Sequence, residues 1–154
     1  MLGSALKVSI NSEVLDLQKT TDYYFPQGVW CKISGNIGSD TPCFNTTGMT
    51  KTYPSDLTDY QLHLRDGFIV PMQDTSMKQF NTTKDLQQWP VDFHVLGSES
   101  EAGSKKWSAQ GRYINDDGVT LDTDGNLNAY TLFATYNGQD TISVLIGMDM
   151  QATK

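Results

Sequence analysis

The chain has 154 residues, a net charge of −7 at neutral pH, 38% apolar residues and two cysteines. This length allows one domain or two small ones, each with a packed core. The acidic balance opposes binding to nucleic acids and to anionic membrane surfaces, and no apolar run approaches the roughly 20 residues of a membrane span. Because glycine, threonine, serine and asparagine are frequent, turns and short strands are favoured over helices. The composition therefore predicts an all-β fold.

The first third of the chain has the pattern of strands joined by turns. Residues 5–10 alternate apolar and polar side chains, which is the period of a half-buried strand. Residues 23–25 and 29–30 are apolar and are separated by a Pro-Gln-Gly turn, which predicts two further strands. Residues 34–59 are rich in glycine, serine, threonine, asparagine and aspartate, and we predict a long loop there.

The cysteines and two glycosylation sequences bear on the cellular compartment. Cys31 and Cys43 enclose part of the predicted loop, and we expect a disulfide between them, with two buried free thiols as the alternative. Asn45 and Asn81 each begin an Asn-x-Thr acceptor sequence for N-glycosylation. Together these features predict a protein of the secretory pathway.

A short buried strand is expected in the segment HLRDGFIVPMQ, residues 63–73. Its Phe-Ile-Val run is opened by Gly67 and closed by Pro71, and we expect it to form the core of the first half of the chain. Residues 74–88 are polar and irregular, so a boundary is placed near Phe80. The prediction is one or two small antiparallel β-sandwich modules, with 1–80 as the first and 81–154 as the second, the latter in part.

The second half predicts an antiparallel meander. Residues 90–96 form the first strand of the second module, and residues 97–106, rich in serine, glutamate and glycine, predict a surface loop. Residues 111–115 then run into Asp116, Asp117 and Gly118, and an Asp-Gly pair favours a tight hairpin turn. Two further strands, residues 129–136 and 141–148, flank the turn signal at residues 137–138.

No residue of the chain carries a strong signal for catalysis, a cofactor or a metal. Asp116 and Asp117 are adjacent, so on a strand they would point to opposite faces, and a turn role is preferred. The Asp and Asn residues at 122, 124 and 126 have the spacing of alternate calcium ligands. The glycine of this segment comes too early for an EF-hand loop, however, and the final glutamate of such a loop is missing. The two histidines have no nucleophile elbow beside them. We expect the tryptophans to pack in the core or between domains, with stacking on sugar rings as the alternative. They are Trp30, Trp89 and Trp107.

Four segments resemble, in the same order, the region that follows the catalytic barrel in glycoside hydrolase family 31, the α-glucosidase family. Residues 1–9 resemble its Leu-Leu-Gly strand, and residues 24–30 resemble its Tyr-Phe-Pro-x-Gly-x-Trp. Residues 63–73 resemble its His-x-Arg-Gly-Gly-x-Ile-x-Pro-x-Gln, and residues 111–122 its Gly-x-Leu-Tyr-x-Asp-Asp-Gly-Glu-Ser. Asp66 stands in place of the first glycine of the third motif, and Val119 replaces the glutamate of the fourth.

The resemblance implies a structural part of a larger enzyme. It implies that this chain forms a proximal and part of a distal C-terminal β-sandwich that pack against a catalytic barrel, on the same or a separate chain. The catalytic aspartates would lie on that barrel, so the chain alone would be inactive. The parent would release glucose from α-linked glucosides with retention, through two carboxylates and without a metal. The location would be the secretory pathway, lysosomal or extracellular. The motif residues would have structural roles: Arg65, Gly67, Pro71, Gln73, Asp116, Asp117 and Gly118.

Two other functions remain open beside this one. An independent β-sandwich module could hold glycans on exposed tryptophans, and an assembly module could contact other chains through an exposed apolar patch on the first module. Both share the predicted absence of catalytic residues, cofactors and metals, and neither involves nucleic acid.

Overall fold

The computed structural model describes residues 1–9, 20–33, 42–54, 61–75, 79–101, 103–115, 128–139 and 141–148. Within these ranges the chain consists mainly of β-strands, with one short helix, α1 (Thr83–Gln87). The predicted all-β class is therefore confirmed. The contacts divide the chain into two compact units, Met1–Asp66 and Gly67–Lys154.

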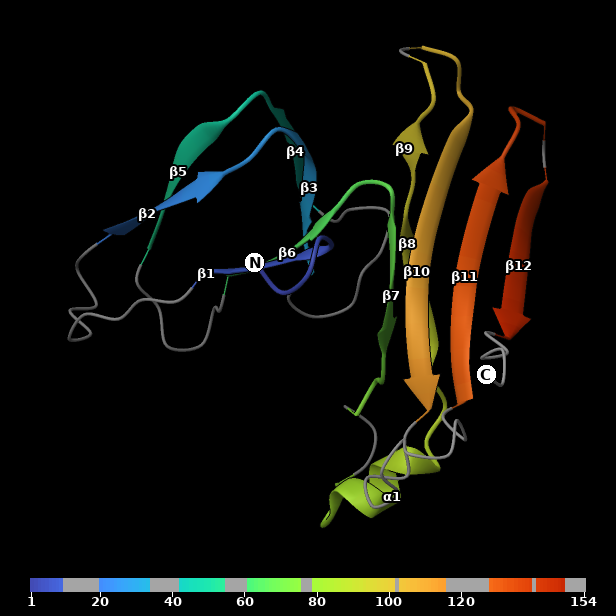
Figure 1. The fold of residues 1–154 in the computed structure, drawn as a ribbon. Coiled ribbons are helices and arrows are strands. Elements are labelled where there is room, and N and C mark those ends of the chain that lie inside the picture. Colours follow the sequence, from blue (N-terminus) through green and yellow to red (C-terminus); the bar gives the residue numbers. More distant parts are fainter. Residues whose placement is uncertain are drawn as a thin grey trace, which may run out of the picture. The chain divides into compact units, whose positions relative to one another are not determined.

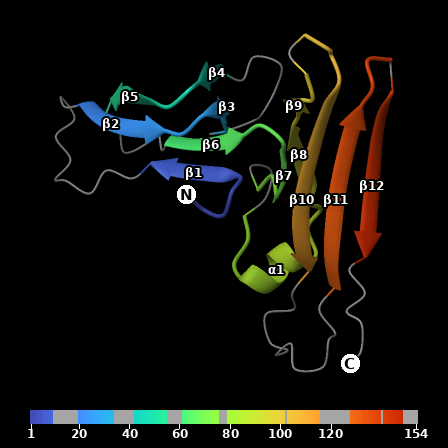
Figure 2. The ribbon, with the colours of Figure 1, turned by 45° about the horizontal axis from the view of Figure 1, so that its top comes forward.

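The first unit contains a four-stranded sheet and a two-stranded sheet. The larger sheet has the order β1, β6, β3, β4 with every pair antiparallel, and Figure 2 shows β1 beside β6. Its strands are β1 (Leu6–Ser9), β3 (Gly28–Lys32), β4 (Cys43–Thr46) and β6 (Gln61–Arg65). The smaller sheet pairs β2 (Thr20–Phe25) with β5 (Met49–Pro54), also antiparallel.

Aromatic side chains join the two sheets of the first unit. Phe25 of β2 is fully buried and makes edge-to-face contacts with Phe44 and His63 of the larger sheet, at ring-centroid distances of 4.9 and 4.8 Å. Trp30 is also fully buried, 5.8 Å from Phe25. Such edge-to-face pairs stabilise beyond the burial of their area. The first unit therefore has the two packed layers expected of a small β-sandwich.

The predicted loop over residues 34–59 is wrong at residues 43–46 and 49–54, where β4 and β5 lie. Their polar sequence fits strands in which two of the four residues of β4 and four of the six residues of β5 are exposed. Cys31 and Cys43 are direct partners in the β3–β4 register, and a disulfide joins them.

The second unit is organised around three long antiparallel strands, β10 (Trp107–Asn115), β11 (Asn128–Tyr136) and β12 (Ile142–Met148), which lie side by side in Figure 1. The predicted meander is confirmed here. The sheet continues from β10 to β7 (Phe68–Met72) and then to β8 (Asp92–Leu96), while β9 (Ser98–Glu99) also pairs with β10. The β7–β10 pairing is parallel, and all other pairs of this sheet are antiparallel.

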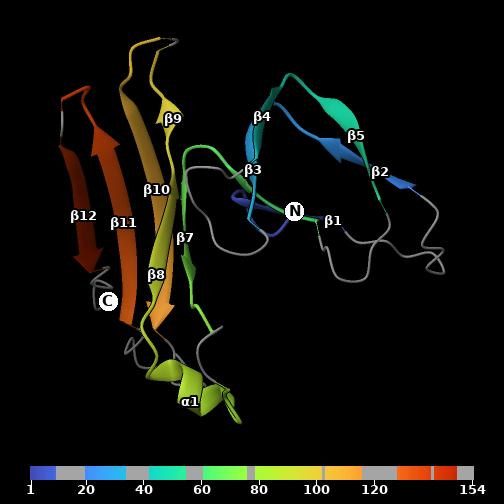
Figure 3. The same ribbon diagram turned by 180° about the vertical axis from the view of Figure 1, so that it is seen from behind.

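The core of the second unit forms where β7 meets β10. Phe68 of β7 pairs with Gln110 of β10, and at the next position a Cβ on Gly111 would clash with the carbonyl oxygen of Ile69. Only glycine permits this close backbone approach. Ile69 is thereby buried with the β10 and β11 side chains Ala109, Leu132 and Ala134. Strand β8, seen behind β10 in Figure 1 and in front of it in Figure 3, contributes a ring contact from Phe93 to Tyr113.

The observed units divide at Asp66 and Gly67, ahead of the predicted boundary near Phe80. Strand β7 belongs to the second unit because it pairs with β8 and β10, so its expected place in the core of the first half is wrong. The identity of the two parts as proximal and distal sandwiches stays a prediction. In the described ranges of the second unit the strands form a single sheet, and no described helix is long and apolar enough to cross a membrane.

Candidate functional site

The motif residue Arg65 and its neighbour Asp66, which replaces a glycine of the motif, both contact the start of β3 and the residue before it. Arg65 donates a hydrogen bond from Nη2 to the carbonyl oxygen of Gln27 at 2.9 Å, and its guanidinium lies 5.8 Å from the centre of the Trp30 ring. Asp66 accepts a hydrogen bond from the Val29 N–H on its Oδ1 at 3.0 Å, and its own N–H donates to the Val29 carbonyl. Both side chains therefore hold the backbone of this segment in place, Arg65 at Gln27 and Asp66 at Val29.

Gly67 holds two strands of the second unit at once. Its N–H donates to the Leu96 carbonyl of β8, and its carbonyl accepts from the Gln110 N–H of β10, at 2.7 and 2.9 Å. The backbone at Gly67 has a φ of +82°, a value that residues other than glycine rarely adopt. The glycine is therefore required by the turn.

Gln73 links the end of β7 to helix α1. Its side-chain Nε2 donates to the carbonyl oxygens of Leu86 and Trp89, at 2.8 and 2.9 Å. The Leu86 carbonyl lies in the last turn of the helix and also accepts from the Trp89 N–H, and the Trp89 carbonyl lies just beyond the helix. The Trp89 ring is held in turn by a hydrogen bond from Nε1 to the Asp74 carbonyl and an edge-to-face contact with Phe80. The motif residue Pro71 lies on β7 and is paired with Phe93 of β8. Trp107, one of the three tryptophans, lies on β10, and its ring stacks on Tyr136 of β11.

The most buried titratable group described is His63 in the aromatic cluster of the first unit. It is 1% exposed, and its Nε2 shares a hydrogen bond of 3.3 Å with the Tyr53 hydroxyl. Burial raises the pKa of Tyr53 because it disfavours the charged phenolate. Burial also lowers the pKa of Lys7, whose ammonium lies 5.1 Å from the centre of the Phe25 ring. This cluster is a packed core of rings rather than an open cleft.

Both sequons are open to solvent. Asn45 lies exposed on β4, and Asn81 is exposed immediately before the Thr82 that caps helix α1. Their glycosylation stays a prediction.

Several predicted sites lie outside the described residues. Asp116, Asp117 and Gly118 are among them, as are the aspartates and asparagine considered as calcium ligands at 122, 124 and 126. Among the residues that the structure does describe, no group of three or more histidine, cysteine, aspartate or glutamate side chains could hold a metal.

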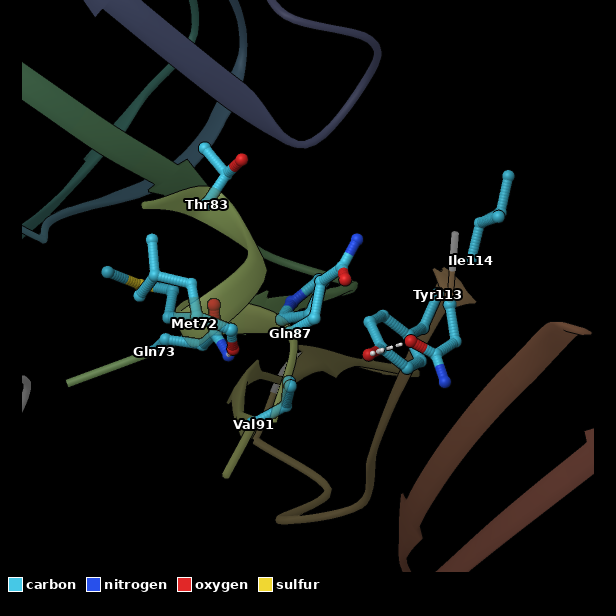
Figure 4. A pocket seen from close by; sticks show the side chains of 10 residues that line it. Met72, Gln73, Thr83, Gln87, Val91, Tyr113 and Ile114 are labelled. Carbon is cyan, nitrogen blue, oxygen red and sulfur yellow. Dashed lines mark hydrogen bonds between the residues drawn. The ribbon is translucent and has the colours of Figure 1, made fainter. Parts of the chain in front are cut away.

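A pocket of about 340 Å³ lies between helix α1, the end of β7 and the end of β10 (Figure 4). Polar, uncharged side chains line half of it: Gln73, Thr83, Gln87, Tyr113 and Asn115. The other half is apolar: Pro71, Met72, Leu86, Val91 and Ile114. Sequence reasoning reaches only Gln73 and Pro71 among these residues. The remainder come from separate segments that no short motif connects.

Comparison of the amino-acid sequence with known proteins shows two partial similarities. No family model matches the chain. Human "Probable maltase-glucoamylase 2" is 27% identical over 130 residues, which cover 84% of this chain and 4% of that protein. Rat "Lysosomal alpha-glucosidase" is 29% identical over 134 residues, which cover 77% of this chain and 13% of that enzyme. The chain thus spans a small share of these relatives, and the similarities support a region related to glycoside hydrolase family 31.

Proposed function

We propose that this chain is the non-catalytic C-terminal β-region of an α-glucosidase-like glycoside hydrolase and that it packs against and stabilises the catalytic barrel. One observation carries this proposal. The similarity covers 84% and 77% of the chain but only 4% and 13% of the two enzymes. That pattern is expected when one structural region of a large hydrolase is compared with whole enzymes. Hydrolysis of O-glycosyl bonds would then belong to carboxylates elsewhere in the parent.

The bonding of the motif residues supports a structural role. Arg65 and Gln73 each use side-chain donors on backbone carbonyls. The Gln73 bonds are partly buried and the Arg65 bond is exposed, and a typical intramolecular hydrogen bond contributes about 1 kcal/mol to stability. The motif would therefore be retained to hold the β-framework in shape.

An exposed apolar row on β12 supports packing against another body. Ile142, Val144 and Ile146 alternate along the strand and so share one face, and they are 59%, 60% and 54% exposed. Such rows are typical of surfaces that bury against a partner. The same row favours the alternative function of an independent assembly module, but it lies in the second unit rather than the first, where the apolar patch is predicted.

The proposed compartment is the secretory pathway, either lysosomal or extracellular. The Cys31–Cys43 disulfide supports it, because disulfides persist in oxidising compartments. One of the similar proteins is a lysosomal enzyme by name.

The non-catalytic part of the proposal is tested by incubating the purified 154-residue chain with maltose. We expect no release of glucose above the rate in buffer. Measurable turnover by the isolated chain, removed together with the chain by an antibody against it, would contradict the proposed structural role.

A further inference from the structure

The pocket of the second unit has one wall that is fixed by hydrogen bonds. Gln73 binds the Leu86 and Trp89 carbonyls, so the end of β7 and the C-terminal turn of α1 are tied together. On the opposite side the Tyr113 hydroxyl lies 3.5 Å from Oδ1 of Asn115, a long contact at the exposed end of β10. Figure 4 shows the helix side chains on one side of the pocket and Tyr113 with Ile114 on the other. The pocket therefore has polar groups on two sides, and hydrogen bonds of Gln73 hold one of these sides in place.

The charge of the lining limits the class of ligand. None of its ten residues is acidic or basic, although the chain carries a net charge of −7. Among these described lining residues an anion would find no basic partner and a cation no carboxylate, so either would lose hydration without a charged contact from them. The ligand class that fits is neutral.

The mixture of polar and apolar side chains limits the ligand further. Thr83 and Gln87 are four residues apart on α1 and so lie on one face of the helix, while Tyr113 and Asn115 lie on one face of β10. Amides and hydroxyls both donate and accept hydrogen bonds, which matches a ligand with many hydroxyl groups. The apolar half of the lining, with Leu86 and Val91, matches the C–H face of such a ligand.

We propose that this pocket binds a neutral saccharide of one or two rings. Its volume of about 340 Å³ lies near the lower end of the range of about 300–1,000 Å³ for small-molecule sites, which favours a short ligand. The inference goes beyond the proposed structural role, and its test does not require a catalytic barrel. The tryptophans considered for sugar stacking from the sequence are absent from this lining.

The test is a titration of the 15N-labelled 154-residue chain, with its disulfide formed, followed by two-dimensional NMR. The probes are maltose, cellobiose and N,N′-diacetylchitobiose, the last representing the core of a protein-attached glycan. At least one disaccharide should give saturable shifts at the amides of Gln87, Tyr113 and Asn115, with a Kd of about 1 mM. Preference for diacetylchitobiose would identify an attached glycan as the source of the ligand, and preference for a glucose disaccharide would identify a free sugar.

Adjacent glutamines provide the matched control. Gln87 lines the pocket, whereas Gln88 is exposed beside it and does not. Gln87→Ala should weaken the Kd about fivefold, the loss of one hydrogen bond, while Gln88→Ala should leave it within about twofold. The proposal is overturned if none of the three disaccharides gives saturable shifts at these amides up to about 50 mM. Equal weakening by the two variants would also overturn it.

Discussion

At the scale of single residues, Gln73 shows how one side chain can hold a helix. Its two hydrogen bonds reach carbonyls thirteen and sixteen residues along the chain. We predict that Gln73→Glu destabilises the second unit by about 1–3 kcal/mol, because it replaces the donor by a negatively charged acceptor facing two carbonyl oxygens. Urea unfolding followed by circular dichroism measures this loss. Hydrogen exchange at the Trp89 amide, which donates to the Leu86 carbonyl, should accelerate as well.

The control for this change is Gln79→Glu, which introduces the same negative charge at an exposed position. It should change the free energy of unfolding by no more than about 0.5 kcal/mol. If the two variants were equally stable, Gln73 would not hold the helix in solution.

Tyr53 gives the first unit a dependence on alkaline pH. Burial raises its pKa in the folded state, so folding retains the proton, and this contribution is lost as pH rises from about 10 through the raised folded value. Lys7 acts in the opposite direction, since its lowered pKa makes stability rise as pH passes through the folded value toward 10.5. Tyr53→Phe leaves Lys7 in place and should flatten the alkaline fall in stability relative to the unmodified chain. At neutral pH it should cost about 1 kcal/mol, the hydrogen bond to His63.

Thermal unfolding at a series of pH values from about 7 to 11 measures both effects. Tyr24→Phe is the matched control, because the Tyr24 side chain is 61% exposed. An alkaline profile that is the same for Tyr53→Phe and the unmodified chain would contradict the assignment.

The residues that sequence reasoning found and missed differ in how their roles arise. Gln73 and Arg65 are identified by a motif, yet their partners at residues 86, 89 and 27 depend on the fold. Thr83, Gln87 and Tyr113 carry no local signal, because a pocket is formed by segments that are distant in sequence. Such sites become visible only after the strands and helix are placed.

At the scale of elements, the close parallel pairing of β7 and β10 depends on Gly111. A Cβ at this position would meet the carbonyl oxygen and the Cβ of Ile69, the one buried residue of β7. We predict that Gly111→Ala destabilises the second unit by about 2 kcal/mol or more, because the two strands must move apart. Chemical denaturation measures the change.

Gly147 on β12 offers a matched substitution. A Cβ there would have its nearest neighbour, the Thr131 carbonyl oxygen, at 3.9 Å, which is an ordinary contact. Gly147→Ala should therefore change stability by less than about 1 kcal/mol. If the two alanine substitutions lowered the free energy of unfolding equally, β7 and β10 would not approach each other closely at Gly111.

Strands with strong local patterns could be predicted from the sequence, and those shaped by their partners could not. The meander of β10, β11 and β12 combines β-branched and aromatic residues with an Asn-Gly turn. In contrast, β5 is an exposed and mostly polar strand whose place depends on pairing with β2. Helix α1 has only five residues, and its capping box of Thr82 and Asp85 stands in a polar segment without helical periodicity.

At the scale of the whole molecule, the division between Asp66 and Gly67 follows from strand pairing rather than composition. Composition changes near Phe80, where the polar segment begins, but β7 already pairs with β8 and β10. A boundary placed by composition therefore falls after the first strand of the second unit. Pairing between distant segments is not encoded in any single window of sequence.

We infer that this chain works as the β-region of a larger α-glucosidase-like enzyme. The inference is tested by capturing the chain from its native source without denaturant, measuring the intact mass of the captured species and assaying it with maltose. We expect a longer polypeptide, or a tightly bound barrel chain, that releases glucose. A lone species near 17.1 kDa without hydrolytic activity would overturn the inference and favour an independent module.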